Sequence, residues 1–418
     1  MAFSNVKDAA RDQPLTTLTA IFVLWKSLLF ILAVASPGIG YDTSTDLLDW
    51  PGGGSVFAKL VRWDAIYFTQ MAKDGHVFEQ EWAFGVGISG LLSRVSRLLY
   101  DVTMPNVQQL AISGLVISHL SSWLSMLLVW HISRRLDPSE QQSTAFVAAS
   151  LYIISPAGIF LSAPYTESVF AALHMLSYLL FIDGRTAFAG GRAGAGSLLN
   201  IGSGTALAFS IIMRSNGILS GFIFAWDAYE ACVRLLRRRG SALDLQRLLS
   251  LVVAGVVAGF GFVLPQYLAW TEYCEGRDPA SVRSWCQNVV PSIFTFVQSH
   301  YWNVGLFRYW TISNIPLFLL AAPTLALLIG SGIDGAVRAV YFRKSPDAYY
   351  LAIPQLILAV LALTTYHVQI ITRIASGYPW WYIWLAAERP RSVKTAVRWM
   401  ALYALIQGGL YASFLPPA

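Results

Sequence analysis

Charge is scarce in this chain: Asp, Glu, Lys and Arg make up 12% of its 418 residues, about half the share of a typical soluble domain. Hydrophobic residues make up 56% instead, which leaves too little charge to cover a soluble surface. Three cysteines are too few for a secreted disulfide scaffold, and no CxxC motif or His/Cys cluster indicates a metal site. The composition also excludes a disordered chain, a collagen-like chain and an outer-membrane barrel.

Long apolar runs take up most of the chain. They lie near residues 15–36, 107–130, 143–161, 167–182, 200–232, 248–270, 312–332, 349–367 and 397–414. Polar residues at 214–217 predict two short helices within 200–232, and the Gly- and Ala-rich segment 184–197 is typical of a flexible loop. A helix needs roughly 20 residues to span a bilayer. The sequence therefore predicts an all-α polytopic membrane protein, with one transmembrane domain over 1–418 and about 9–11 transmembrane helices.

The basic residues are sorted along the chain, and the net charge is +6. They cluster in short segments at 134–135, 234–239 and 338–344, as they do in cytosolic loops of membrane proteins. We therefore expect no nucleic-acid partner. With the N-terminus in the cytosol, two long polar loops with amphipathic helices, 37–106 and 271–309, lie on the opposite side of the membrane.

Two of the cysteines, Cys274 and Cys286, share the second long loop. A disulfide between them is allowed if this loop lies in an oxidising lumen. Spacing does not determine disulfide geometry, so two free thiols are the alternative.

The segment 55–75 in the first long loop predicts an amphipathic helix, because a serine can cap it and a glycine can end it. Asp64 then falls in the apolar stripe of this helix. A carboxylate there costs free energy unless it has a partner or a chemical role. Local pairing with Lys59 or Arg62 is the alternative, but neither lies three or four residues from Asp64. Asp64 is therefore the candidate catalytic residue.

Other polar or aromatic groups stand against the hydrophobic trend near the ends of the apolar runs: Glu167, Arg214, Asn216, Trp302, Arg308, His367, Gln369 and Arg373. Glu167 also suits the first turn of a helix, and an interfacial aromatic belt also explains the segment 301–310. Arg and His suit a phosphate, aromatic faces suit sugars, and a carboxylate can act as a general base. Together these groups fit sugar transfer from a lipid phosphate. No DxD motif or acidic cluster is present, so neither a divalent metal nor another cofactor is indicated.

Five groups of motifs follow one another in a characteristic order. They are RWDAIYF at 62–68, SPA with SAPYTES at 155–168, RSNG at 214–217, YWNVG with RYW at 301–310, and HVQ with Arg373 at 367–373. Through these motifs and their order, the chain resembles the GPI mannosyltransferase 2 family over about residues 20–390.

The resemblance implies a GT-C glycosyltransferase of the endoplasmic-reticulum membrane with a lumenal active site. The implied donor is dolichyl phosphate mannose, and the implied acceptor is the GPI lipid precursor that carries one mannose. The new bond is α-1,6, formed with inversion in a single displacement, so Asp64 is the expected general base. Arg62 and Trp63 share its motif and are expected to bind substrate. The expected phosphate ligands are Arg214, Arg308, His367 and Arg373.

Three further expectations concern partners and alternatives. In some fungi the family works with a small accessory membrane subunit. The resemblance therefore implies two further partners, membrane lipid and such a subunit. Another dolichyl-phosphate-sugar transferase of the GT-C type is the alternative within enzymes. A lipid transporter or scramblase is the alternative from another class, and it predicts repeat symmetry and broken helices.

Overall fold

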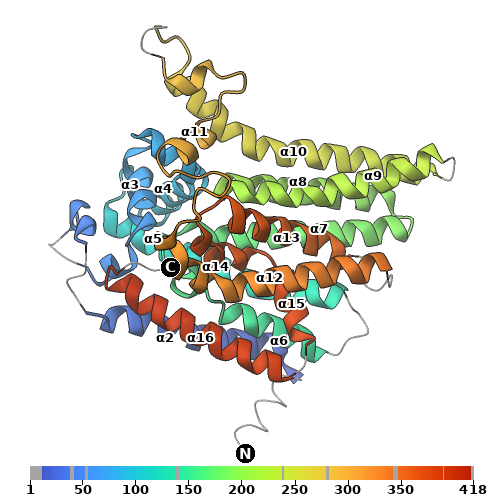
Figure 1. The fold of residues 1–418 in the computed structure, drawn as a ribbon, viewed down its shortest axis with the longest axis horizontal. Coiled ribbons are helices and arrows are strands. Elements are labelled where there is room, and N and C mark those ends of the chain that lie inside the picture. Colours follow the sequence, from blue (N-terminus) through green and yellow to red (C-terminus); the bar gives the residue numbers. More distant parts are fainter. Residues whose placement is uncertain are drawn as a thin grey trace, which may run out of the picture.

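The computed structural model describes residues 12–37, 42–51, 55–136, 142–237, 240–278, 282–341, 347–388 and 390–415. No strand occurs in these ranges, and helices of very different length make up most of them. The long helices lie roughly side by side, while the short helices α3, α4 and α11 gather at one end of the bundle (Figure 1). The predicted all-α fold is confirmed.

The bundle is built from α2 (Pro14–Ala35), α5 (Val107–Leu136), α6 (Gln142–Ile153), α7 (Thr166–Ala189), α8 (Ala193–Met213), α9 (Phe222–Leu236), α10 (Ala242–Tyr273), α12 (Ile315–Tyr341), α13 (Ala348–Thr364), α15 (Trp380–Ala386) and α16 (Pro390–Ala412). Five of the described helices, α2, α5, α8, α10 and α12, are long and apolar enough to cross a membrane. The chain is therefore a multi-pass membrane protein.

The expected flexible loop at 184–197 is wrong, because α7 continues to Ala189 and α8 begins at Ala193. Its small residues let two helices approach instead. A Cβ on Gly184 would lie 2.6 Å from Oδ1 of Asn200. Close approach through glycine is common between membrane helices.

The expected break at 214–217 is confirmed. Helix α8 ends at Met213, the short helix η5 spans Ser215–Gly221, and α9 follows. Parts of two basic clusters, residues 238–239 and 342–344, lie outside the described residues.

The two long polar loops fold into short helices. The first contains η1 (Ser44–Leu47), η2 (Val56–Leu60), α3 (Asp64–Asp74), η3 (Glu79–Phe84) and α4 (Gly87–Tyr100), and the second contains η6 (Ser284–Gln287) and α11 (Ile293–His300). Glu79 joins them, because its buried carboxylate lies 3.0 Å from Nε of Arg283 and accepts a 3.0 Å bond from Nε1 of Trp285. Cys274 and Cys286 form a disulfide, so the alternative of two free thiols is wrong.

Candidate active site

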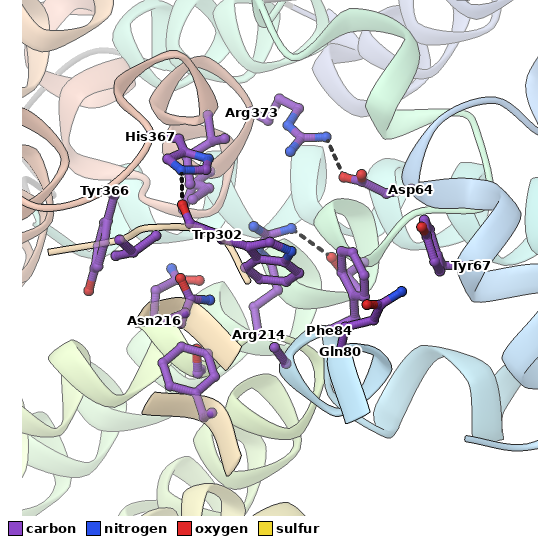
Figure 2. Close-up of a pocket in the computed structure, with 18 of the residues that line it drawn as sticks. Asp64, Tyr67, Gln80, Phe84, Arg214, Asn216, Trp302, Tyr366, His367 and Arg373 are labelled. Atoms are coloured by element: carbon purple, nitrogen blue, oxygen red, sulfur yellow. Dashed lines mark hydrogen bonds and ion pairs between the residues drawn. The ribbon is translucent and has the colours of Figure 1, made fainter. Parts of the chain in front are cut away.

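A cavity of about 500 Å³ opens where the two polar loops meet the ends of the bundle helices. Figure 2 shows charged, amide and aromatic side chains from widely separated segments around it. Six of the residues expected from the sequence line it: Asp64, Arg214, Asn216, Trp302, His367 and Arg373. The cavity is therefore the candidate active site.

Asp64 reaches the cavity from the first residue of α3. The expected continuous helix over 55–75 is wrong, since η2 ends at Leu60 and α3 begins only at Asp64. The backbone of Trp63 causes the break, with φ of +56°, a conformation that costs an L-residue about 1–3 kcal/mol. Asp64 thus lies at a helix N-terminus, where the dipole favours a carboxylate, and not in the middle of an apolar stripe.

The C-terminal helix α16 and the turn that follows it hold this strained backbone in place. The Trp63 ring lies 5.2 Å from that of Phe414, and the Arg62 guanidinium lies 4.8 Å from the Phe414 ring. The Tyr411 hydroxyl is 3.1 Å from both the amide and the carbonyl of Arg62. Arg62 and Trp63 therefore support Asp64 from behind, and neither side chain lines the cavity.

An ion-pair chain runs along the cavity wall. Arg373 donates from Nη1 to Oδ2 of Asp64 at 3.0 Å, and its Nε lies 3.8 Å from Oε1 of Glu167. Arg214 donates to the same Glu167 oxygen at 2.9 Å. Burial opposes the charge of Arg373, but the two carboxylates outweigh burial and raise the pKa of its guanidinium.

Glu167 itself is fully buried and does not line the cavity. It lies in the first turn of α7, as the helix-start interpretation expected. It also contacts both arginines. One carboxylate therefore holds two cavity guanidinium groups at once.

The far side of the cavity is formed by the second polar loop and the segment after α13. Nε2 of His367 lies 2.9 Å from the carbonyl oxygen of Trp302. The ring of Tyr309 stacks on the His367 ring, with centroids 4.7 Å apart. Arg308 and Gln369, also expected at the site, do not line the cavity, and Arg308 is exposed to solvent.

An aromatic wall beside Asp64 adds Tyr67 and Phe84 to the expected Trp302. Tyr67 and Phe84 stack with ring centroids 5.4 Å apart, and Phe84 lies 5.1 Å from the Trp302 ring. Gln80, one turn before Phe84, also lines the cavity. Tyr67 lies three residues after Asp64, and helical spacing places both on one face of α3.

Within the described ranges, no group of three or more His, Cys, Asp or Glu side chains is arranged to hold a metal ion. The charged side chains of the ion-pair chain that line the cavity are Asp64, Arg214 and Arg373.

Solved membrane glycosyltransferases are similar to this structure at low identity. An oligosaccharyltransferase from Archaeoglobus fulgidus, tethered to an acceptor peptide, matches with a TM-score of 0.49 and 12% identity. The match covers 98% of this chain and 56% of that one. ArnT from Cupriavidus metallidurans, bound to undecaprenyl phosphate, matches with a TM-score of 0.49 and 15% identity over 92% of this chain and 63% of that one.

Sequence relatives match over nearly the whole length. Proteins named GPI mannosyltransferase 2 from Aspergillus oryzae and Gibberella zeae are each 39% identical, covering 97% and 98% of this chain and 96% and 99% of their own. The Yarrowia lipolytica protein of that name is 34% identical over 96% of this chain and 99% of its own. The family described as mannosyltransferase (PIG-V) matches residues 23–418. The chain therefore belongs to this family and is a membrane-embedded mannosyltransferase of GPI-anchor synthesis.

Proposed function

We propose that this enzyme transfers mannose in α-1,6 linkage from dolichyl phosphate mannose to the GPI precursor that carries one mannose, with Asp64 as general base. The observation that carries the proposal is the meeting of Asp64, Arg373 and Arg214 around one cavity. A base and two cations are the groups that sugar transfer from a lipid phosphate requires. The proposed architecture is of the GT-C type.

The two arginines are the proposed ligands of the donor phosphate. Each reaches the cavity while sharing the carboxylate of Glu167. A guanidinium presents several donors in one plane and can bind a phosphate while keeping a carboxylate partner. Asn216 and His367 line the same cavity and are further candidates to contact the donor.

Asp64 is the proposed base for the hydroxyl of the acceptor mannose. A β-linked donor and an α-linked product require attack from the face opposite the phosphate, in one displacement. Such a reaction needs one carboxylate to accept the hydroxyl proton. The aromatic wall of Tyr67, Phe84 and Trp302 supports this assignment, because an apolar sugar face can pack on aromatic rings beside Asp64.

We further propose that the cavity faces the lumen of the endoplasmic reticulum. The loop that closes one side of the cavity contains the Cys274–Cys286 disulfide, and disulfides persist in oxidising compartments. Arg134 and Arg135 lie at the end of α5 that is remote from the first polar loop, as expected of a cytosolic side.

Depletion of the protein in cells tests the reaction. GPI intermediates would then be extracted and their mannose content determined by mass spectrometry. We expect a precursor with one mannose to accumulate. Accumulation of an unmannosylated precursor, or of one with two mannoses, would assign the enzyme to another step. In microsomes, a radiolabelled donor and the purified precursor with one mannose would show the transfer directly, and linkage analysis would report the bond.

A further inference from the structure

Helix α7 carries a buried stripe that extends well beyond Glu167. Phe170, His174 and Tyr178 follow Glu167 at three, seven and eleven residues, which places all four on one face of the helix. Each is at most 1% exposed. The proposed reaction uses only the first of them, so the buried histidine two turns further along has no role so far.

His174 joins two separate segments of the chain. Its Nδ1 lies 2.9 Å from the carbonyl oxygen of Gly377, and its Nε2 lies 2.6 Å from Oγ of Ser220. Gly377 ends the short helix η9 (Ala375–Gly377), shortly after Arg373, and Ser220 lies in η5, shortly after Arg214. The two segments joined by His174 are thus those that carry the two cavity arginines.

The partners determine the proton positions on the ring. A carbonyl oxygen can only accept, so Nδ1 carries the proton and donates it to Gly377. In the neutral ring Nε2 then accepts from the hydroxyl of Ser220. The oxygen of Ser220 is in turn 2.8 Å from the hydroxyl of Tyr178, which donates to it. Both ring nitrogens are therefore satisfied, as a buried polar group requires.

Packing around the ring leaves little freedom for either segment. The His174 ring stacks on Phe170 at 4.9 Å and lies 4.8 Å from the ring of Tyr378. A Cβ on Gly377 would lie 2.3 Å from the Phe170 ring. The amide of Asn216 is 3.3 Å from the Tyr378 hydroxyl, which links the two segments a second time.

We propose that His174 is a positioning residue that sets the distance between the guanidinium groups of Arg214 and Arg373, and thereby the site for the donor phosphate. Helix α7 then positions the two arginines through two of its residues. Glu167 holds the two side chains, and His174 holds the two segments that carry them. This inference rests on the proposed function of the cavity.

Three variants of the full-length protein in lipid nanodiscs test it. His174→Phe keeps a flat ring against Phe170 but loses both hydrogen bonds. His174→Gln keeps one donor and one acceptor. Ser220→Ala removes only the link to the segment of Arg214. Ser177→Ala is the matched control, because Ser177 is equally buried on α7 but bonds to Ser203 of α8, at 3.0 Å.

The measurements are KM for dolichyl phosphate mannose, KM for the acceptor, kcat, the melting temperature, and the Kd of dolichyl phosphate without catalysis. For His174→Phe we expect donor KM and this Kd to rise about tenfold, as loss of one charged contact would cause. The acceptor KM should stay within about twofold, since its proposed wall is not joined to this ring. His174→Gln should recover most of the loss, and Ser220→Ala should fall between them.

Unchanged dolichyl phosphate binding in Ser220→Ala and His174→Phe would overturn the inference. So would a rise in both KM values that Ser177→Ala reproduces. If His174→Phe does not fold, the smaller Ser220→Ala change decides the question. Wild-type enzyme that binds dolichyl phosphate but transfers no mannose would instead contradict the proposed function and leave the positioning test intact.

Discussion

Asp64 and Arg373 form an ion pair with a 3.0 Å contact although 309 residues separate them. The Asp64 side chain keeps one third of its surface exposed to the cavity, whereas Arg373 is mostly buried. Arg373 therefore orients the carboxylate, and a lipid phosphate entering the cavity would meet this guanidinium beside the base. The ion pair therefore places the proposed general base next to a proposed ligand of the donor phosphate.

Asp64→Asn should abolish mannose transfer while the protein still accumulates in the membrane. The amide has nearly the same shape but cannot take the hydroxyl proton, and loss of a general base costs about 10²–10⁴ in rate. Transfer would be measured in microsomes with dolichyl phosphate mannose and acceptor. Asp74→Asn, at the other end of α3, is the control and should keep normal activity. Normal turnover by Asp64→Asn would contradict the base assignment.

Arg373→Ala should raise the donor KM, because it removes a proposed phosphate ligand and the partner of Asp64. We expect an increase of about tenfold or more, since charge-assisted contacts contribute about 1.5–3 kcal/mol. Arg308→Ala is the contrasting variant. Its side chain is exposed and lies outside the cavity lining, so its donor titration should match wild type. An unchanged titration for Arg373→Ala would exclude this residue as a phosphate ligand.

Tyr411→Phe should destabilise the turn that leads into Asp64. The lost hydroxyl is within 3.1 Å of backbone atoms of Leu60 and Arg62, and a buried backbone group without a partner costs about 1–3 kcal/mol. A lower melting temperature together with a lower kcat is expected. Tyr403→Phe on the same helix is the control. A stable Tyr411→Phe enzyme of full activity would show that the turn does not depend on this contact.

Thiol labelling should find one free cysteine before reduction and three after it. Cys274 and Cys286 are disulfide-bonded, and Cys232 is free. The protein would be denatured, labelled with maleimide and weighed by mass spectrometry, with Cys232→Ser as the control that leaves no label before reduction. Three labels without reductant would contradict the disulfide. Replacing Cys274 and Cys286 by Ala should cost about 2–3 kcal/mol, as loss of a short cross-linked loop predicts.

Local sequence patterns predicted most of the helices correctly. They failed where the backbone conformation depends on contacts with residues far away in the sequence. Apolar runs indicate spans because helix burial in lipid depends on the composition of each segment. The helix expected over 55–75 was wrong because Trp63 takes a positive φ, which Tyr411 of the C-terminal helix and Phe414 just after it support. The loop expected at 184–197 was wrong because glycine is as common where two helices pack closely as it is in loops.

The sequence by itself determined the class of the protein, the approximate positions of most apolar helices and the identity of the unusual carboxylate at position 64. Only the tertiary structure decided which charged groups meet. It brought Arg214 and Arg373 to one buried glutamate and left Arg308 in solvent. The physical reason is that hydrophobicity acts along each segment, whereas an ion pair depends on how helices far apart in the chain pack against one another.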